Sequence, residues 1–285
     1  MKFFGQRKKK LPDPRAIRTN KVKAVERFSV TKRQILVFFS VLMTGGLMVS
    51  LLSDGRSLYL MSFLLAVAAG LITIWVMRKD LAGIKYFALP ILPFFFTFAM
   101  ALFFQLLPER WLTRIPFMGV YGVSIYLIFL NQNVYNIAAI RTIALLRAAH
   151  SVGLLFTLIS VFIISNVVFS LRFNFIILTA LLTVICGLLI FQTLWSFELE
   201  DLLTKRLFKM TLVLALMIGQ VVLTLAFWPA EPTVSAIVVT TGVYVMLGLS
   251  QAYYADRLFR RTAVEYLSLG VGVFLLLFLT TSWIA

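Results

Sequence analysis

The sequence contains very few of the residue types that carry chemistry in metal sites and enzymes. It has one cysteine, Cys186, and one histidine, His150. A lone cysteine cannot form a disulfide within the chain, and one histidine with one distant cysteine cannot supply the ligands of a zinc site. No serine or cysteine near His150 has an orienting acid, as a nucleophilic triad requires. We therefore predict no metal and no cofactor, and we interpret His150 as a solvated or interfacial residue.

Acidic residues are also scarce, with 11 Asp and Glu against 27 Lys and Arg. Their main cluster is Glu198, Glu200 and Asp201. Enzymes that hold Mg²⁺ and phosphates need several hard carboxylate ligands close together. We interpret the cluster instead as the start of a short cytoplasmic helix over 198–209, in which Asp201 pairs with Lys205 four residues later. The sequence thus argues against an enzyme.

Charged residues make up only 13% of the chain, and 61% of it is hydrophobic. Soluble domains are about 45–50% apolar and about 25% charged. The apolar residues here come in long blocks, which argues against a barrel of short alternating strands. Because lipid cannot hydrogen-bond to backbone groups, only helices and closed barrels span a membrane. The sequence therefore predicts an all-α fold, a polytopic bundle of transmembrane helices.

Nine apolar blocks predict about nine spans, since a span needs about 17–25 residues. The blocks cover residues 35–52, 58–77, 86–107, 115–130, 152–171, 173–195, 210–228, 234–250 and 263–284. No Asp, Glu, Lys, Arg or His lies in the middle of a block, which argues against a proton pump or a charge-coupled carrier. The chain then divides into a basic cytoplasmic tail, 1–33, and a transmembrane domain, 34–285.

Basic residues are distributed unevenly over the segments between the blocks. The tail holds 12 of the 27 Lys and Arg, the connectors after even-numbered blocks hold 11, and the connectors after odd-numbered blocks hold four. The positive-inside rule places the tail and the even-numbered connectors in the cytoplasm. With nine spans the C-terminus lies outside. The predicted location is the plasma (inner) membrane, with multiple spans.

Basic residues that border the spans are candidates for contacts with anionic lipid headgroups. They are Arg141, Arg147, Lys205, Arg206, Arg257, Arg260 and Arg261. The connector 131–151 is amphipathic, so it either lies along the membrane surface or extends the flanking spans. A basic tail beside a span indicates membrane contact rather than nucleic-acid binding. The predicted partners are the lipid bilayer, its anionic headgroups and proteins that dock at the cytoplasmic face.

A glutamine followed three residues later by an aromatic residue recurs near the cytoplasmic ends of the even-numbered blocks. The glutamines are Gln132, Gln192 and Gln251, and the aromatic residues are Tyr135, Trp195 and Tyr254, with Trp75 one period earlier. Duplication of a helical hairpin would give this pattern, with the glutamines in interhelical contacts. Convergence would also give it, because aromatic residues favour the membrane interface. Both interpretations stay open.

Three functions are compatible with this pattern. The leading interpretation is a non-enzymatic component of a membrane assembly, a scaffold that docks partners through its basic cytoplasmic face. The first alternative is a facilitator or flippase for a neutral or lipid substrate, and the second is a lipid-modifying enzyme. The scaffold leads only because the sequence lacks the chemical signatures of the other two functions.

The charge asymmetry gives a test of the predicted topology. A phosphatase that is active only outside the cytoplasm should be active when fused after Ala285, because nine spans place the two termini on opposite sides. The same reporter fused after Lys205 should be inactive. A well-expressed but inactive fusion after Ala285 would show that the number of spans is wrong.

Overall fold

The computed structural model describes residues 33–50, 56–78, 81–106, 110–139 and 145–281. Within these ranges the chain forms helices and no strand. The helices are Arg33–Val49, α2 (Arg56–Met77), α3 (Lys85–Leu106), α4 (Trp111–Ala138), α5 (Leu146–Ser170), α6 (Phe175–Glu198), α7 (Lys205–Ala226), α8 (Pro232–Tyr254) and α9 (Arg260–Thr280). Eight of them, α2 to α9, are long and apolar enough to cross a membrane, and Arg33–Val49 is shorter, with 17 residues. The prediction of an all-α fold is confirmed, and eight helices have the length and composition that the predicted membrane spans require.

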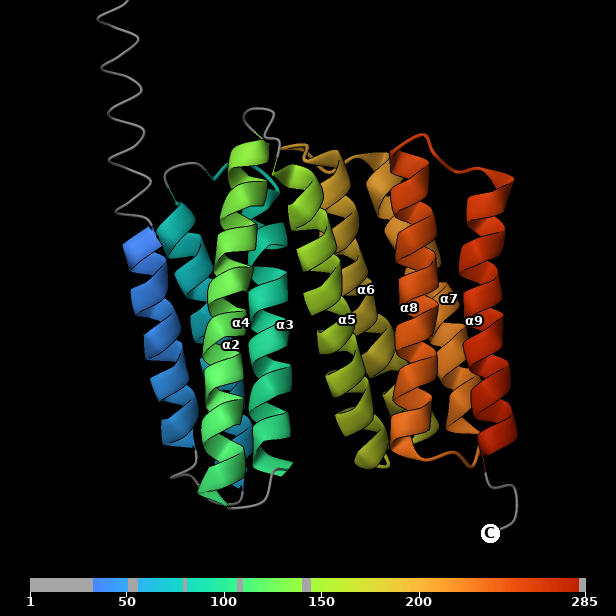
Figure 1. The fold of residues 1–285 in the computed structure, drawn as a ribbon, viewed down its shortest axis with the longest axis horizontal. Helices are drawn as coiled ribbons and strands as arrows, with labels where there is room; N and C mark the ends of the chain where they lie inside the picture. Colours follow the sequence, from blue (N-terminus) through green and yellow to red (C-terminus); the bar gives the residue numbers. More distant parts are fainter. Residues whose placement is uncertain (1–32, 51–55, 79–80, 107–109, 140–144, 282–285) are drawn as a thin grey trace, which may run out of the picture.

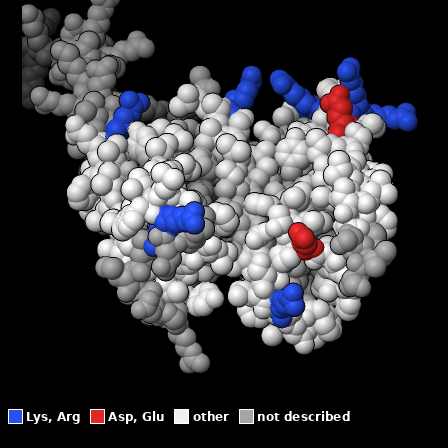
Figure 2. Space-filling model, turned by 60° about the horizontal axis from the view of Figure 1, so that its bottom comes forward, with Lys and Arg blue, Asp and Glu red and all other residues white. Residues whose placement is uncertain are grey.

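Consecutive helices run up and down the bundle, so their connectors alternate between its two ends (Figure 1). The described residues that follow α2, α4, α6 and α8 lie at one end, here called the basic end. Most of the described lysines and arginines lie there, whereas the opposite end in Figure 2 is largely uncharged. Both the assignment of the basic end to the cytoplasm and the count of nine spans stay predictions. The tail lies outside the described residues, apart from Arg33.

Four helices, α3, α5, α6 and α8, form the centre of the bundle. Each has a larger share of its apolar window buried than α2, α4, α7 or α9. The central helices pack on one another, and α2, α4 and α7 cover their outer sides. Large side chains such as Phe96, Tyr121 and Trp195 fill the interior. Lipid tails are as apolar as these side chains, so close packing and interhelical polar contacts stabilise the arrangement.

The helix α4 is longer than the predicted span 115–130. It continues to Ala138, and α5 already begins at Leu146. Residues 131–138 and 146–151 therefore continue the flanking helices, as the second of the two alternatives for 131–151 predicts, and residues 140–144 lie outside the described ranges. The predicted span stopped at residue 130 because three polar residues follow it, namely Asn131, Gln132 and Asn136. The side chains of these residues are nevertheless buried on the inner face of α4.

The predicted short helix over 198–209 is also wrong. Leu199, with φ 54°, ends α6 in the left-handed region, and α7 does not begin until Lys205. The carboxylates of the cluster are used separately. Glu200 accepts a hydrogen bond from Thr204 at 2.9 Å, and Asp201 pairs with Lys85 rather than with Lys205.

This ion pair joins the segment before α7 to the start of α3. The Lys85 ammonium lies 2.6 Å from the Asp201 carboxylate, and the side chain of Lys85 is only 2% exposed against 56% for Asp201. The Ile84 N–H also donates to the Asp201 carbonyl oxygen at 2.9 Å. Gly83 has φ 54°, and a Cβ there would collide with that oxygen. The close approach of the two segments thus requires glycine at this position.

Removing each partner of this pair should have a different effect on stability. Asp201→Ala leaves a buried ammonium without its counter-ion and should cost about 2–4 kcal/mol, whereas Lys85→Met removes the buried charge and should cost less than about 1 kcal/mol. Glu265→Ala, which breaks the exposed pair with Arg261, should cost only about 0.3–0.5 kcal/mol. The thermal transition of the full chain in detergent measures all three. Equal losses for Asp201→Ala and Lys85→Met would contradict this explanation.

Candidate functional site

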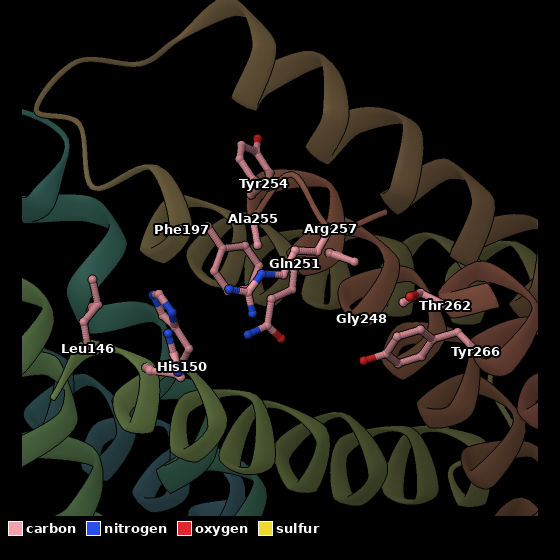
Figure 3. Close-up of a pocket in the computed structure, with 12 residues that line it drawn as sticks. Leu146, His150, Phe197, Gly248, Gln251, Tyr254, Ala255, Arg257, Thr262 and Tyr266 are labelled. Atoms are coloured by element: carbon pink, nitrogen blue, oxygen red, sulfur yellow. The ribbon is translucent and has the colours of Figure 1, made fainter. Parts of the chain in front are cut away.

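A cavity of about 880 Å³ lies at the basic end, between α5, α6, α8 and α9. The residues that line it are Leu146, Arg147, His150, Phe197, Gly248, Gln251, Ala252, Tyr254, Ala255, Arg257, Thr262 and Tyr266. Figure 3 shows Gln251 and Arg257 in the middle of this group, with His150 on one side and Tyr266 on the other. The cavity therefore brings together polar residues from segments that are distant in the sequence.

The C-terminal end of α8 positions Arg257. Asp256 adopts a left-handed conformation with φ 52°. The Arg257 N–H then donates to the Ala252 carbonyl oxygen at 2.8 Å, which reverses the chain after the helix. This six-to-one hydrogen bond is typical of a Schellman motif, which more often has glycine at the left-handed position. The turn carries Arg257 back to the end of its own helix, where it lines the cavity beside Gln251.

The first turns of α5 supply Arg147 and His150. The His150 Nε2 lies 2.8 Å from the Ser196 carbonyl oxygen, and because a carbonyl only accepts, Nε2 carries the proton in this contact. The imidazole packs edge-on against Phe197, with ring centroids 5.0 Å apart. His150 is therefore half-buried and held in one orientation. Of the two predicted alternatives, a solvated or an interfacial residue, this excludes a fully solvated ring. Arg147, three residues earlier, is exposed and shares its helix face.

The inner part of the cavity is formed where α9 meets α8. The Tyr266 ring lies directly against Gly248, where a Cβ would collide with three ring atoms. Tyr266 also packs on Tyr244, with ring centroids 5.6 Å apart. This end of the cavity is therefore aromatic with hydroxyl groups, whereas the outer end carries the arginines.

The α6 end forms the remaining wall and holds α8 in place. Tyr254 donates to the Glu198 carboxylate at 2.9 Å, and Figure 3 shows its hydroxyl pointing away from the cavity. The Arg206 guanidinium lies over the rings of Tyr253 and Tyr254, at 4.8 and 4.9 Å from their centroids. The Glu198 carboxylate is therefore engaged by the Tyr254 hydroxyl outside the cavity. Among the described residues that line the cavity, none is acidic and two are arginines.

The three predicted glutamines have different surroundings. Gln132 and Gln192 are buried inside the bundle, and Gln251 lines the cavity. Neither polar atom of the Gln132 amide has a hydrogen-bond partner among the described residues, so the predicted interhelical bond is absent there. Only Gln132 and Gln192 share a buried environment. The duplication of a helical hairpin therefore stays a prediction.

Two of the four predicted interface aromatics are exposed or partly exposed, and two are buried. The Trp75 ring is 51% exposed, with the Arg78 guanidinium 5.3 Å from its centroid. Tyr254 is half-buried. Tyr135 and Trp195 are buried, and their polar atoms donate to the Ala149 and Glu200 carbonyl oxygens. These two rings contact protein and not headgroups, because they lie on the inner faces of α4 and α6.

The predicted headgroup contacts fall into separate groups. Arg147 and Arg257 both line the cavity. Lys205 and Arg206 form a shallow basic surface with Lys209 and Tyr253 on the α7 side. Arg260 and Arg261 are exposed at the start of α9, where Arg261 pairs with Glu265 at 3.1 Å. Arg141 lies outside the described residues.

Sequence reasoning missed Gly248, Thr262 and Tyr266 as cavity residues, and Lys85 as the partner of Asp201. The only signal for Tyr266 was an aromatic residue near the predicted cytoplasmic end of the last block, a position that the membrane interface also explains. Within the described ranges, no group of three or more His, Cys, Asp or Glu residues could hold a metal ion.

Comparison with known proteins gives one match. A family model described as "Protein of unknown function (DUF5656)" matches residues 37–280, which include every helix from α2 to α9. No curated protein and no solved structure matches the chain.

The buried amides of α4 give a prediction about stability. Gln132→Leu should leave the thermal transition unchanged or raise it by the equivalent of about 1 kcal/mol, because an unpaired buried amide gains nothing from its polarity. Tyr135→Phe is the matched change on the same helix. It should cost about 0.5–1.5 kcal/mol, since the Tyr135 hydroxyl donates to the Ala149 carbonyl oxygen at 2.9 Å. Equal losses for both variants would mean that the Gln132 amide is hydrogen-bonded in the folded protein.

Proposed function

The chain belongs to the DUF5656 family of proteins of unknown function, and we propose that this member is a non-enzymatic integral membrane protein that binds an anionic headgroup in the cavity between α5, α6, α8 and α9. The proposal rests on the charge of the cavity lining. Arg147 and Arg257 both line the cavity, and no described residue of the lining is acidic. We place this site at the cytoplasmic leaflet of the plasma (inner) membrane, with the C-terminus outside.

Charge and hydrogen-bond donors support an anion as the ligand. Two guanidinium groups line the cavity together with the Gln251 amide and the hydroxyls of Thr262 and Tyr266. A guanidinium carries five N–H donors in a planar fork that matches carboxylate and phosphate oxygens. Cytoplasmic leaflets are rich in anionic lipids, so a basic cavity there meets its ligand at high local concentration.

Binding is favoured over catalysis by the surroundings of His150. Its Nε2 is engaged by the Ser196 carbonyl oxygen. The described lining also offers no carboxylate and no cysteine that would act beside it as nucleophile or base. This supports the interpretation of the sequence as a facilitator or flippase for a neutral or lipid substrate over the enzymatic one.

A scaffold is the second candidate, and the surface of α9 favours it. Among the described residues of α9, Leu277 alone is buried, and Leu269, Phe274 and Leu275 are among its exposed apolar residues. A helix of this kind faces either lipid or another membrane helix. In this second proposal, the partners that dock at the basic end are proteins and not nucleic acids.

Removing the cavity arginines should weaken the binding of anionic lipid. In nanodiscs, Arg147→Gln with Arg257→Gln should lower the affinity for phosphatidylglycerol by about 10–100-fold, the equivalent of one or two charge-assisted hydrogen bonds. The matched control is Arg260→Gln with Arg261→Gln, which removes the same charge at the same end, outside the cavity lining. Retention of lipids by the purified full chain, measured by native mass spectrometry, compares them. Equal losses of lipid affinity in the two double variants would show that the lipid binds through the general positive charge of the basic end and not in the cavity.

A further inference from the structure

The position and shape of the cavity identify its ligand more closely. We propose that the ligand is a membrane lipid with a terminal phosphate, which enters the cavity sideways between α5 and α9. This inference rests on the proposed function, because it names the class of headgroup and the route to the same site. Three features of the described residues support it, namely the depth of the cavity, the open side between two helices and the charge of the lining.

The cavity extends from the headgroup level to the edge of the hydrocarbon. Gly248 lies six residues before the end of α8 at Tyr254, and Tyr266 lies six residues after the start of α9 at Arg260. At a rise of 1.5 Å per residue, both positions are about 9 Å inside the helix ends. The interfacial layer of a bilayer is about 5–7 Å thick on each side. Because α9, with 21 residues, is about as long as the hydrocarbon core is thick, the inner end of the cavity lies at or below the level at which lipid tails begin.

The polarity of the lining changes along this depth. Arg257 and Gln251 lie at the outer part, and the Tyr266 ring against Gly248 forms the inner part. Tyrosine combines an apolar ring with a hydroxyl and is enriched at this depth in membranes. A soluble anion would use the outer part only, whereas an amphiphile uses both. The gradient therefore favours a lipid over a free phosphate ion.

The cavity lacks a helix on one side. α9 packs against α8 and makes no extended contact with another described helix. Leu146 and Arg147 of α5 and Thr262 and Tyr266 of α9 line the cavity, yet these two helices make no extended contact with each other. Lipid can therefore approach between α5 and α9 without separating any packed pair of helices.

The charge of the lining matches a terminal phosphate better than a phosphodiester. A phosphate monoester carries about −1.5 to −2 charges at pH 7 and presents three acceptor oxygens. A diester carries one charge and has two free oxygens. Arg147 and Arg257 supply two positive charges from the ends of two different helices, and the described lining has no carboxylate to offset them. Two guanidinium groups can form more charge-assisted hydrogen bonds to a phosphate with three free oxygens than to one with two.

The test compares four probes on the full-length protein in nanodiscs: phosphatidic acid, phosphatidylglycerol, phosphatidylcholine and inorganic phosphate as a soluble competitor. Phosphatidic acid should bind at least about tenfold more tightly than phosphatidylglycerol, which corresponds to one further charge-assisted hydrogen bond. Inorganic phosphate should compete at least about a hundredfold more weakly, because it lacks the high effective concentration of a membrane-bound ligand. Arg147→Gln with Arg257→Gln should abolish the preference for phosphatidic acid, and Arg260→Gln with Arg261→Gln should preserve it.

The route is tested with phosphatidic acid that carries a photoreactive group on its acyl chain. Crosslinks should concentrate on α5 and α9 at the depth of Tyr266 and deeper in the membrane, and they should decrease in the Arg147→Gln, Arg257→Gln variant. Labelling spread evenly over α2, α4 and α7 would overturn sideways access. Equal affinities for phosphatidic acid and phosphatidylglycerol, both above phosphatidylcholine, would overturn the terminal phosphate and leave the proposed function intact. Competition by inorganic phosphate at lipid-like strength would identify a soluble anion as the ligand. No preference for either anionic lipid over phosphatidylcholine would overturn the proposed function itself.

Discussion

α3, α5 and α8 are each fixed to the C-terminal end of α6 by a polar contact. Asp201, just after that end, pairs with Lys85, the Ser196 carbonyl oxygen accepts from His150, and Glu198 accepts from Tyr254. Inside a bilayer the hydrophobic effect does not draw helices together, so such contacts contribute strongly to their relative positions. Because two of the three partners, His150 and Tyr254, also line the cavity, the end of α6 sets its width.

The positions of the helices and the alternation of their connectors between the two ends of the bundle were predictable from the sequence. Hydropathy and the number of basic residues in a connector are properties of single segments. The buried faces were not predictable in this way. Asn131 and Asn136 read as the end of a span, yet they lie within α4, because a helix continues wherever its inner face finds a packing partner. The pairing of Asp201 shows the same limit, since Lys205 was the nearest cation in the sequence and Lys85 is the nearest in space.

The candidate site was predictable in part. Arg147, Gln251 and Arg257 were recognised as polar residues at the ends of spans, and the cavity contains all three. Their grouping was not predictable, because it depends on which helices are neighbours, and charge patterning along one chain does not contain that information. Gly248 had no signal at all, since its role is to leave room for a ring from another helix.

The weak attachment of α9 has a consequence for biogenesis. The polar contacts at the end of α6 and the packing among α3, α5, α6 and α8 are all formed by residues up to Tyr254. Proteins are synthesised from the N-terminus, and earlier parts of a chain can fold before later ones emerge. The helices up to α8 can therefore assemble in the membrane before α9 leaves the ribosome. Tyr266 would then close onto Gly248 after that assembly, so a chain interrupted shortly before α9 would leave this glycine uncovered while the earlier helices are already packed.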